Sequence, residues 1–580
     1  MKDNKWKIIT LVCLMLGVLI VNTYYLGQKS GYYVDEGMTL FLANGHYNGA
    51  VTSRSDSDLT DFLKTFVLKD SIRSTISNLV QMLKELTTAG NYSEEGTVEW
   101  YDAARNLLQG ERTWMSGQEL FDEVTVPEGE RFQYLQVFIN QAMDVHPPFY
   151  YLLVHTIFSL FAGTYSDGYL FFVNIVALML TCLVLWKIAD VLSDNSYYPI
   201  LSVVMFGFSQ GFISCAMYFR MYAWLTLWVT LTIYLHLLLK RADYKSEKRQ
   251  SVFFIITVIL GFYTHYYYIV FLAPLAICFV VQMLMEHRKT EAVGYIKRCI
   301  LAGIFSIVIW PLSLYHIFFG YRGTEAVSNL VADGFFTRLR SYYNIIRQAF
   351  FLESNWVVIV VLAAGSVLFI IRRKQKESFH TDTVSSIVEI GLSCAFYLFI
   401  ISQIAPAQSD RYIMCLYPMI ALVVAAIFAG MVKLIKSGQR IQIVAVVIFT
   451  GVFFLSSLTV IHPDYLYSEQ REMVLGTEEA PADMNALMIA DGDFRGFPEA
   501  VKLSHYRNVI VLEEQQLSIL EDKKPEEQNG NMIVYIYGGL DQDANLEQVC
   551  ELMGYPQSAT QEISSDIIDF KAYEVTREVE

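Results

Sequence analysis

Residues 8–26 read IITLVCLMLGVLIVNTYYL, and soon afterwards the chain reaches the acidic pair Asp35-Glu36. As an α-helix, this apolar run is long enough to cross the ~30 Å hydrocarbon core of a bilayer. Three lysines precede the run and no small-residue cleavage site follows it, so we predict a retained signal anchor with the N-terminus inside. This first span places Asp35 and Glu36 just beyond the outer surface of the membrane.

The composition indicates that most of the chain lies in a membrane. Of 580 residues, 54% are hydrophobic and only 17% are charged, which is far from the balance of soluble domains. The net charge of −15 comes from the end of the chain, because residues 462–580 hold 25 Asp and Glu against 8 Lys and Arg. An acidic tail without a basic cluster argues against nucleic acid as a partner. The eight cysteines show neither a disulfide framework nor CxxC metal spacing.

Short basic segments mark the cytoplasmic side of the predicted membrane domain, at residues 240–249, 287–298, 372–376 and 433–440. Neighbouring basic segments must enclose an even number of crossings, whereas the stretch from His146 outside to Lys240 inside must hold an odd number. That stretch contains four apolar segments, so we interpret the shortest, residues 149–163, as an interfacial or re-entrant helix. The result is a polytopic α-helical membrane protein of about 11 transmembrane helices, with the C-terminus outside.

We predict two domains in this chain. Residues 1–461 form the transmembrane domain, which includes a large first external loop at 27–148, and residues 462–580 form a small extracytoplasmic domain. Loop segments 59–86 and 134–143 carry apolar residues at helical spacing, which predicts amphipathic helices lying on a surface. Apolar runs in the tail alternate with helical stretches, which predicts an α/β domain with parallel strands at 486–490, 508–512 and 532–537.

Asp35 and Glu36 are the candidate catalytic residues, because an ionised side chain near lipid is costly unless water, a partner or a substrate is close. A carboxylate within hydrogen-bond reach of a hydroxyl can take its proton in the transition state, with a rate gain of about 10² to 10⁴. Asp35 would be this base, and Glu36 would orient a neighbour or contact substrate. The alternative is that Asp35 is a solvated or helix-capping carboxylate outside the bilayer.

A second motif, HPPFYYLL at 146–153, places a titratable ring next to two rigid backbone angles. The prolines fix the angle at which the chain enters the next helix, so the imidazole of His146 is held at the membrane surface. The simpler interpretation is that the two prolines only start a helix.

Arginines flanked by aromatic residues recur at the outer ends of the apolar runs. Arg220 lies in the sequence YFRMY with Tyr222, and Arg411 lies in SDRY with Tyr412. A guanidinium at this depth suits the phosphate of a lipid whose tail lies in the bilayer, while contact with lipid headgroups is the alternative. For Arg411, an ion pair with the neighbouring Asp410 is a further alternative. His265 and Tyr266 could line a sugar-binding cleft or belong to an interfacial aromatic belt. The loop between two later spans adds an outer basic patch that favours an anionic ligand: Arg322, Arg338, Arg340 and Arg347.

The order of these motifs resembles that of the GT-C-fold membrane glycosyltransferases. Within them the chain is similar to bacterial relatives of the protein O-mannosyltransferases and lipid A aminoarabinose transferases. The resemblance rests on Asp35-Glu36, the HPPxYYLL block, YFRMY, Tyr263-Thr264-His265-Tyr266 and Asp410-Arg411-Tyr412 with Pro418. It covers about residues 5–460, and the acidic tail lies outside it.

The resemblance implies an inverting glycosyltransferase that takes a sugar from a polyprenyl-phosphate donor in the outer leaflet. The acceptor would be a cell-envelope glycan, a lipid or a protein. Asp35 takes the family's base position, Arg220 and Arg411 hold the departing lipid phosphate, and His146 orients donor or acceptor. Because phosphate leaves already charged, no second carboxylate is needed as an acid. We expect no obligatory cofactor, although some GT-C enzymes use a divalent cation and Asp35 and Glu36 offer oxygen ligands.

Two other classes of function are compatible with a polytopic chain. A transporter of a lipid-linked or small anionic substrate would be expected to have inverted repeats and ionisable groups near the middle of the bilayer. The sequence shows no such repeat, and its long apolar runs are nearly free of central charges. A non-catalytic sensor or scaffold would use the acidic tail as its receptor head.

Overall fold

The computed structural model describes residues 2–577 except 47–48, 56, 58, 89–98, 319, 331–333, 375–380, 436–437, 469–481 and 526–530. Lys376 and Lys436 of the predicted cytoplasmic segments therefore lie outside the described residues. The chain divides into two compact units that alternate along the sequence. The bundle unit comprises Met1–Gly27, Phe171–Met217 and Met221–Asp464. The loop-tail unit comprises Gln28–Leu170, Tyr218–Arg220 and Tyr465–Glu580.

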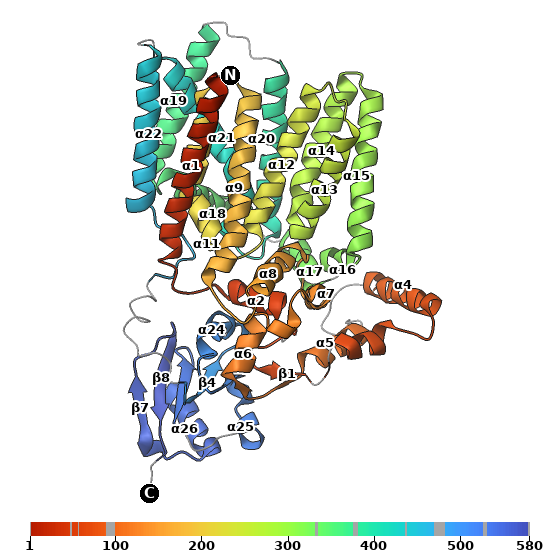
Figure 1. The fold of residues 1–580 in the computed structure, drawn as a ribbon, viewed down its shortest axis with the longest axis vertical. Coiled ribbons are helices and arrows are strands. Elements are labelled where there is room, and N and C mark those ends of the chain that lie inside the picture. Colours follow the sequence, from red (N-terminus) through yellow and green to blue (C-terminus); the bar gives the residue numbers. More distant parts are fainter. Residues whose placement is uncertain are drawn as a thin grey trace. The chain divides into compact units, whose positions relative to one another are not determined.

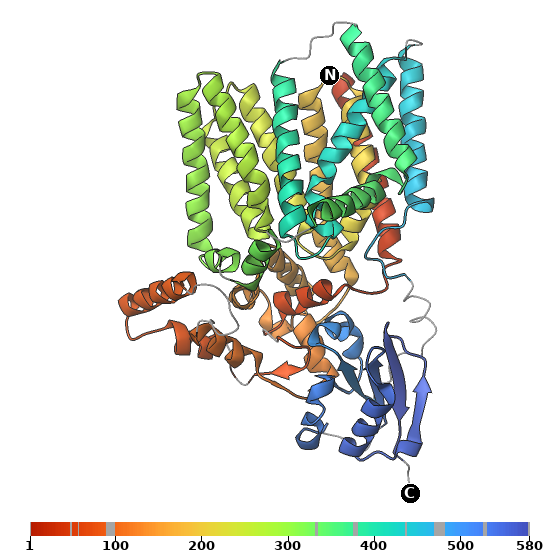
Figure 2. The ribbon, with the colours of Figure 1, turned by 180° about the vertical axis from the view of Figure 1, so that it is seen from behind.

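The bundle unit is helical. Its helices and short helical turns are α1 (Lys2–Leu26), most of α9 (Asp167–Leu192), α10 (Tyr197–Gly207), α11 (Gln210–Met217), α12 (Tyr222–Arg241), α13 (Lys248–Thr264), α14 (Tyr267–Met285), α15 (Lys289–Ile309), α16 (Ser313–Phe318), α17 (Tyr321–Leu330), α18 (Phe335–Phe351), α19 (Asn355–Lys374), α20 (Thr381–Ile404), η3 (Asp410–Tyr412), η4 (Met414–Leu416), α21 (Tyr417–Lys433) and α22 (Gln439–Thr459). Helices α13, α14 and α15 lie side by side (Figures 1 and 2). Helix α10 packs against α21.

Many helices of the bundle unit are long and apolar enough to cross a membrane. Within the described ranges, eight helices qualify, or ten if each bent helix pair counts as one span. The pair α10–α11 is bent by 53° and the pair α18–α19 by 79°, so that α18 runs across the direction of α19 (Figure 2). The remaining predicted span corresponds to α13, whose 17 residues stand at the lower limit for crossing. The polytopic helical fold is thus confirmed.

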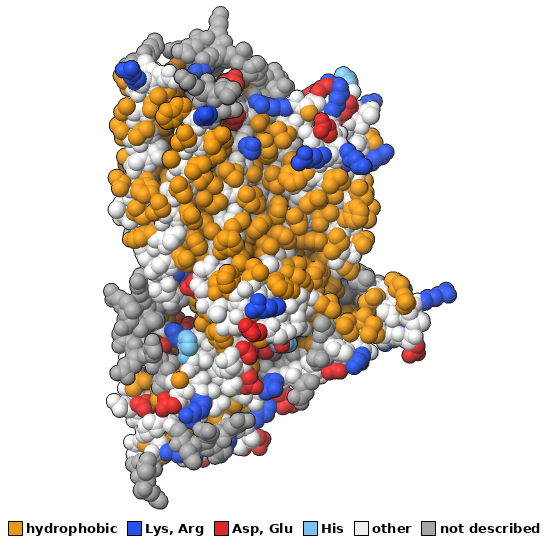
Figure 3. Space-filling view, in the orientation of Figure 1, with side chains coloured by type: hydrophobic (Ala, Val, Ile, Leu, Met, Phe, Trp, Pro, Cys, Tyr) orange, Lys and Arg blue, Asp and Glu red, His pale blue; other side chains and the backbone are white. Residues whose placement is uncertain are grey.

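The surface of the bundle explains why it needs lipid around it. Hydrophobic side chains cover most of the visible face of these helices (Figure 3). Val308 on α15 is 70% exposed and Val447 on α22 is 64% exposed. Contiguous apolar surface of this extent is not stable against water and is typical of a bilayer-facing surface.

The loop-tail unit combines helices and strands from both ends of the chain. Its helices and helical turns are α2 (Val34–Asn44), α3 (Leu59–Phe62), η1 (Leu63–Val67), α4 (Ile72–Thr88), α5 (Glu99–Gln109), α6 (Gly117–Val124), η2 (Glu128–Glu130), α7 (Tyr134–Met143), α8 (Phe149–Leu160), η5 (Asp493–Arg495), η6 (Phe497–Glu499), α24 (Ala500–Leu503), η7 (Glu514–Gln516), α25 (Ile519–Asp522), α26 (Gln542–Met553) and η8 (Gln557–Ala559). Its strands are β1 (Ser53–Arg54), β2 (Glu111–Arg112), β3 (Met115–Ser116), β4 (Asn485–Ala490), β5 (Asn508–Glu513), β6 (Met532–Tyr537), β7 (Thr560–Ile563) and β8 (Phe570–Val575).

The tail folds as the predicted α/β domain. Strands β5, β4 and β6 are parallel neighbours, and their nearly continuous burial explains why each reads as an unbroken apolar run. The full sheet has the order β3-β5-β4-β6-β8-β7, with β8 antiparallel to β6. One edge strand, β3, comes from the first external loop and pairs antiparallel with β5. The loop and the tail therefore share one sheet, a grouping that the predicted ranges 1–461 and 462–580 do not describe.

The first loop forms the predicted amphipathic helices. Helix α7 occupies residues 134–143 as expected, whereas segment 59–86 divides into α3, η1 and α4. In the ribbon, α4 lies at the far end of this loop from the sheet (Figure 1). The apolar segment that we interpreted as too short for a span forms α8, whose 12 residues reach only about 18 Å.

Candidate active site

Helix α2 carries the acidic pair and begins immediately before it. Asp35 and Glu36 occupy its first turn, where the positive end of the helix dipole favours carboxylates. The Oε2 atom of Glu36 accepts a hydrogen bond of 2.7 Å from the backbone N–H of Tyr33, which precedes the helix. Glu36 therefore caps the helix, and the neighbouring Asp35 side chain projects from a fixed first turn.

Asp35 is half-buried and bonded to a segment from far along the chain. The hydroxyl of Tyr218 donates to Asp35 Oδ2 at 3.0 Å. The main-chain carbonyl of Asp35 accepts bonds from Arg220 Nη1 at 3.1 Å and from Thr39 Oγ1 at 2.9 Å. The segment Tyr218–Arg220 thus holds both the side chain and the backbone of the predicted base. This segment lies between two parts of the bundle unit in sequence but belongs to the loop-tail unit.

Glu36 is fully buried and serves as the centre of a separate set of contacts. Its Oε1 atom accepts from Lys29 Nζ at 3.0 Å and from the backbone N–H of Phe219 at 2.8 Å. Burial raises the pKa of Glu36, while Lys29 and the two backbone donors act in the opposite direction. Both carboxylate oxygens already have donors from the protein, and the orienting role of Glu36 stays a prediction.

Arg220 connects Asp35 to the predicted histidine. The Arg220 side chain is buried, its Nη1 also donates to Thr39 Oγ1 at 2.9 Å, and its Nη2 lies 3.4 Å from His146 Nε2. Since a guanidinium only donates, Nε2 of His146 is the acceptor in this contact and its ring proton is on Nδ1. That nitrogen faces Asp144 Oδ2 at 2.7 Å.

Asp144 is a residue that the sequence prediction missed. Burial acts to raise its pKa, but the ring of His146, the charge of Arg220 and the N–H of Val145 outweigh burial and hold the pKa at about 2. Asp144 is therefore ionised at neutral pH and fixes the orientation of the imidazole. We name the complete group the Asp35 cluster: Lys29, Asp35, Glu36, Thr39, Asp144, His146, Tyr218 and Arg220.

The other predicted site residues lie in the bundle unit, where aromatic rings gather. The Tyr222 ring lies 5.5 Å from His265 and 6.2 Å from Tyr412, and Tyr267 joins the group at 5.9 Å from Tyr412. Arg411 lies over the ring of its neighbour Tyr412 at 4.9 Å. The structure thus brings Tyr222, His265 and Tyr412 together.

Tyr266, predicted to line a sugar cleft, is held by two side chains of the same unit. Its hydroxyl accepts a bond of 2.9 Å from Trp310 Nε1 and lies 3.0 Å from His316 Nδ1. The proposed basic patch is also locally bonded. Arg322 pairs with Glu325 at 2.7 Å, and Arg338 and Arg347 donate to the carbonyls of Gln403 and Glu353.

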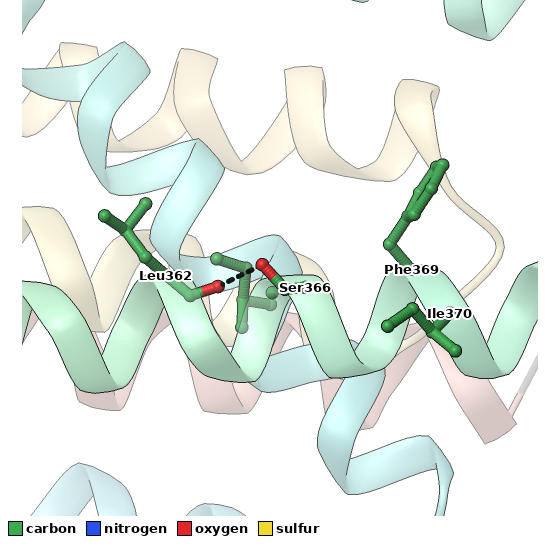
Figure 4. Close-up of a pocket in the computed structure, with 6 residues that line it drawn as sticks. Leu362, Ser366, Phe369 and Ile370 are labelled. Atoms are coloured by element: carbon green, nitrogen blue, oxygen red, sulfur yellow. Dashed lines mark hydrogen bonds between the residues drawn. The ribbon is translucent and has the colours of Figure 1, made fainter.

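In the part of the chain that the structure describes, no metal cluster is found, and a groove on the bundle lies apart from the predicted site residues. Among those residues, no group of three or more His, Cys, Asp or Glu side chains could hold a metal ion. A groove of about 440 Å³ between α19 and α21 is lined mainly by apolar side chains, and its Ser366 hydroxyl donates to the carbonyl of Leu362 at 2.9 Å (Figure 4). The groove holds none of the predicted site residues. That no cofactor is required stays a prediction.

Fold and site together define a polytopic helical membrane protein with a charged cluster in its loop-tail unit. The chain matches no family model and no curated protein. Among solved structures it is similar to a crystal structure of ArnT from Cupriavidus metallidurans bound to undecaprenyl phosphate, with 11% identity, a TM-score of 0.45, and coverage of 78% of this chain and 94% of that one. The apo structure of the same protein gives 9% identity, a TM-score of 0.43, and coverage of 78% and 93%.

Proposed function

We propose that the protein is an inverting glycosyltransferase that moves a sugar from a polyprenyl-phosphate donor to an extracytoplasmic acceptor. The observation that supports this most is the Asp35 cluster. Three residues predicted separately from the sequence, Asp35, His146 and Arg220, belong to one hydrogen-bonded group. The group combines a carboxylate that can take a proton with a guanidinium that can offset negative charge on a phosphate, and His146 would orient the donor or the acceptor.

In the proposed reaction, a hydroxyl of the acceptor attacks the anomeric carbon of the sugar from the face opposite the phosphate. The new carbon–oxygen bond forms while the bond to the phosphate oxygen breaks, and the polyprenyl phosphate leaves with the bonding electrons. Asp35 takes the proton of the attacking hydroxyl. Arg220 adds positive charge that offsets the negative charge developing on the leaving phosphate.

We further propose roles for the bundle residues. Arg411 would bind the departing phosphate, with Tyr222 and Tyr412 alongside the donor, and His265 and Tyr266 would contact the sugar. The membrane lipids are the natural surroundings of such a donor. The acceptor would be a glycan, a lipid or a protein of the cell envelope.

Among the described residues, one buried ion pair of the bundle unit bears on the transporter alternative and gives it no support. This pair joins Lys240 Nζ to Glu389 Oε1 at 2.9 Å, and Lys240 lies in the last turn of α12. The pair is therefore at a helix end, where a lysine reaches the interface, and not at the middle of a span.

Turnover of a radiolabelled polyprenyl-phosphate sugar in proteoliposomes tests the proposal. We expect transfer or slow hydrolysis by the wild type and a loss of about 10² to 10⁴ in kcat for Asp35→Asn. Asp70→Asn, which changes an exposed carboxylate of the same loop, should behave as wild type. An unchanged rate in Asp35→Asn would remove Asp35 from the mechanism, and no turnover with any donor would favour a transporter or a sensor.

A further inference from the structure

A buried lysine joins the start of the first loop to the start of the tail. Lys29 Nζ is 3.0 Å from Glu36 Oε1, and both side chains are fully buried. The same ammonium donates to the carbonyl of Tyr465 at 2.7 Å. It also lies over the ring of Phe219 at 4.7 Å. Burying a charged ammonium costs desolvation free energy, which its three kinds of partner must offset. The ammonium therefore fixes the relative positions of the groups that it contacts.

Glu36 links the buried Lys29 to the residues that hold the predicted base, Asp35. One oxygen accepts from Lys29 and from the N–H of Phe219, and the other accepts from the N–H of Tyr33. Phe219 follows Tyr218, whose hydroxyl bonds to Asp35. Moving Glu36 would therefore move both the first turn of α2 and the donor to its carboxylate.

The tail contributes the aromatic ring of Tyr465 to the contacts around Asp35. The ring of Tyr465 stacks on that of Tyr218, with centroids 4.1 Å apart and planes 19° apart. The backbone nearby is tied by a 2.8 Å bond from the N–H of Ser30 to the carbonyl of Leu466. Tyr465 and Tyr467 have φ values of 68° and 53°, which cost about 1 kcal/mol or more for residues with a side chain. Tertiary contacts must hold this segment in that conformation.

We propose that Lys29, Glu36 and Tyr465 are positioning residues for Asp35, and that the C-terminal segment is therefore a necessary part of the active site. The inference rests on the proposed glycosyltransferase function. Its physical basis is that a displacement of about 1 Å in a reacting group can cost about 10² in rate. The tail thus has a role in turnover although it holds none of the predicted catalytic residues.

Substitution of the Tyr465 ring tests the contribution of the tail. Tyr465→Leu removes the stacking on Tyr218, and Tyr465→Phe keeps it. We expect Tyr465→Leu to lower kcat by about 10- to 100-fold with little change in the KM for the donor, and Tyr465→Phe to retain wild-type kcat. Tyr555→Leu is the matched control, because it removes a buried tyrosine ring from the core of the tail domain. It should leave kcat unchanged.

The ion pair offers a second test that separates positioning from stability. Lys29→Met or Glu36→Gln alone leaves one buried group without its partner, so both should lower the thermal unfolding temperature. The double variant removes the pair together, and we expect it to recover the unfolding temperature but not kcat. Recovery of both by the double variant would show that the pair acts only on stability and would overturn its positioning role.

The wild type serves as the reference in the same proteoliposome assay. If it does not turn over any polyprenyl-phosphate sugar, the proposed function fails and this inference falls with it. If it turns over and Tyr465→Leu matches it in kcat and KM, only the positioning role of the tail is overturned. Equal losses in Tyr465→Leu and Tyr555→Leu would likewise overturn it, because a general weakening of the tail domain would then explain the effect.

Discussion

The hydroxyl of Tyr218 donates a hydrogen bond of 3.0 Å to Asp35 Oδ2 across 183 residues of sequence. A hydrogen bond to a carboxylate is charge-assisted and stronger than one between neutral groups, so it holds the Asp35 side chain in place. It also fixes the direction in which the second carboxylate oxygen points. Both effects matter for a residue proposed to act as a base.

We predict that Tyr218→Phe slows the reaction. The variant keeps the ring that stacks on Tyr465 and removes only the hydroxyl. Loss of a hydrogen bond to a charged group should reduce kcat by about tenfold or more. A wild-type kcat in Tyr218→Phe would contradict this role.

Gly37 allows α2 to approach the tail closely, and Gly37→Ala should disturb the active site. A Cβ atom at this position would lie 2.3 Å from the carbonyl oxygen of Phe497 and 2.8 Å from the nitrogen of Pro498. Since both atoms belong to the backbone, α2 or η6 must shift, and the residue directly before Gly37 is the buried Glu36. We expect a fall in kcat of about 10- to 100-fold.

The matched control for this substitution is Gly391→Ala on α20, where a Cβ would meet no atom within 4 Å. It should leave kcat unchanged and slightly stabilise the helix, because alanine is the better helix former. Wild-type kinetics in Gly37→Ala would show that the contact between α2 and Phe497 tolerates movement.

The sequence predicted those site residues that are charged or titratable and lie next to a long apolar run. Asp35, His146 and Arg220 were predictable for this reason, and so were the parallel strands, whose unbroken apolar runs indicate burial on both faces. Lys29 was also detectable, because a lysine on the outer side of the first span departs from the positive-inside rule. Asp144 carried a weaker signal, its position two residues before His146.

The remaining features depend on contacts between distant segments. The bond from Lys29 to the Tyr465 carbonyl spans 436 residues, and nothing local in the sequence marks Tyr465 as a partner. The edge strand β3 has two residues and β7 is largely polar, so neither shows the alternation that predicts a strand. The assignment of the first loop to the same sheet as the tail follows from such pairings and was not predictable from composition.

Arg220→Lys should destabilise the loop-tail unit although it keeps the charge. The guanidinium reaches the Asp35 carbonyl, Thr39 Oγ1 and His146 from one planar group, and a single ammonium cannot reproduce this geometry. We expect a loss of about 2 kcal/mol in unfolding free energy. Thr39→Val, which removes one of these acceptors, should cost about 1 kcal/mol. Thermal unfolding in detergent measures both, and equal stabilities of wild type and Arg220→Lys would exclude a bridging role.

Asp144 should make the free energy of unfolding depend on pH below about pH 4. Its folded pKa of about 2 is below the ordinary aspartate value of 3.8, so the unfolded chain binds the proton more tightly. The stabilisation is therefore complete above about pH 4 and is lost as the pH falls towards 2, for a total of about 2 kcal/mol. The difference in unfolding temperature between wild type and Asp144→Asn should shrink from about pH 4 to about pH 2. A constant difference would show that Asp144 does not exchange its proton on unfolding in this range.

The sidedness of the bundle can be tested with single cysteines in a background without the eight native ones. The basic segments predict that Asp194, between α9 and α10, is cytoplasmic and that Ser328 on α17 is extracytoplasmic. Both residues are exposed. Gly323 on the same helix is unsuitable, because a Cβ there would lie 2.3 Å from the carbonyl oxygen of Ile317.

In intact cells, an impermeant thiol reagent should label Ser328→Cys at once and Asp194→Cys only after the membrane is opened. The physical reason is that the reagent carries charge and cannot cross the hydrocarbon core. Labelling of Asp194→Cys in intact cells would require an additional crossing before α9, and α8 is the apolar segment in that region. It would also place the chain that follows α9 on the opposite side from the one proposed here, so the outer-leaflet donor would have to be abandoned. Turnover measured with donor supplied to one face of sealed proteoliposomes would then identify the side on which the reaction occurs.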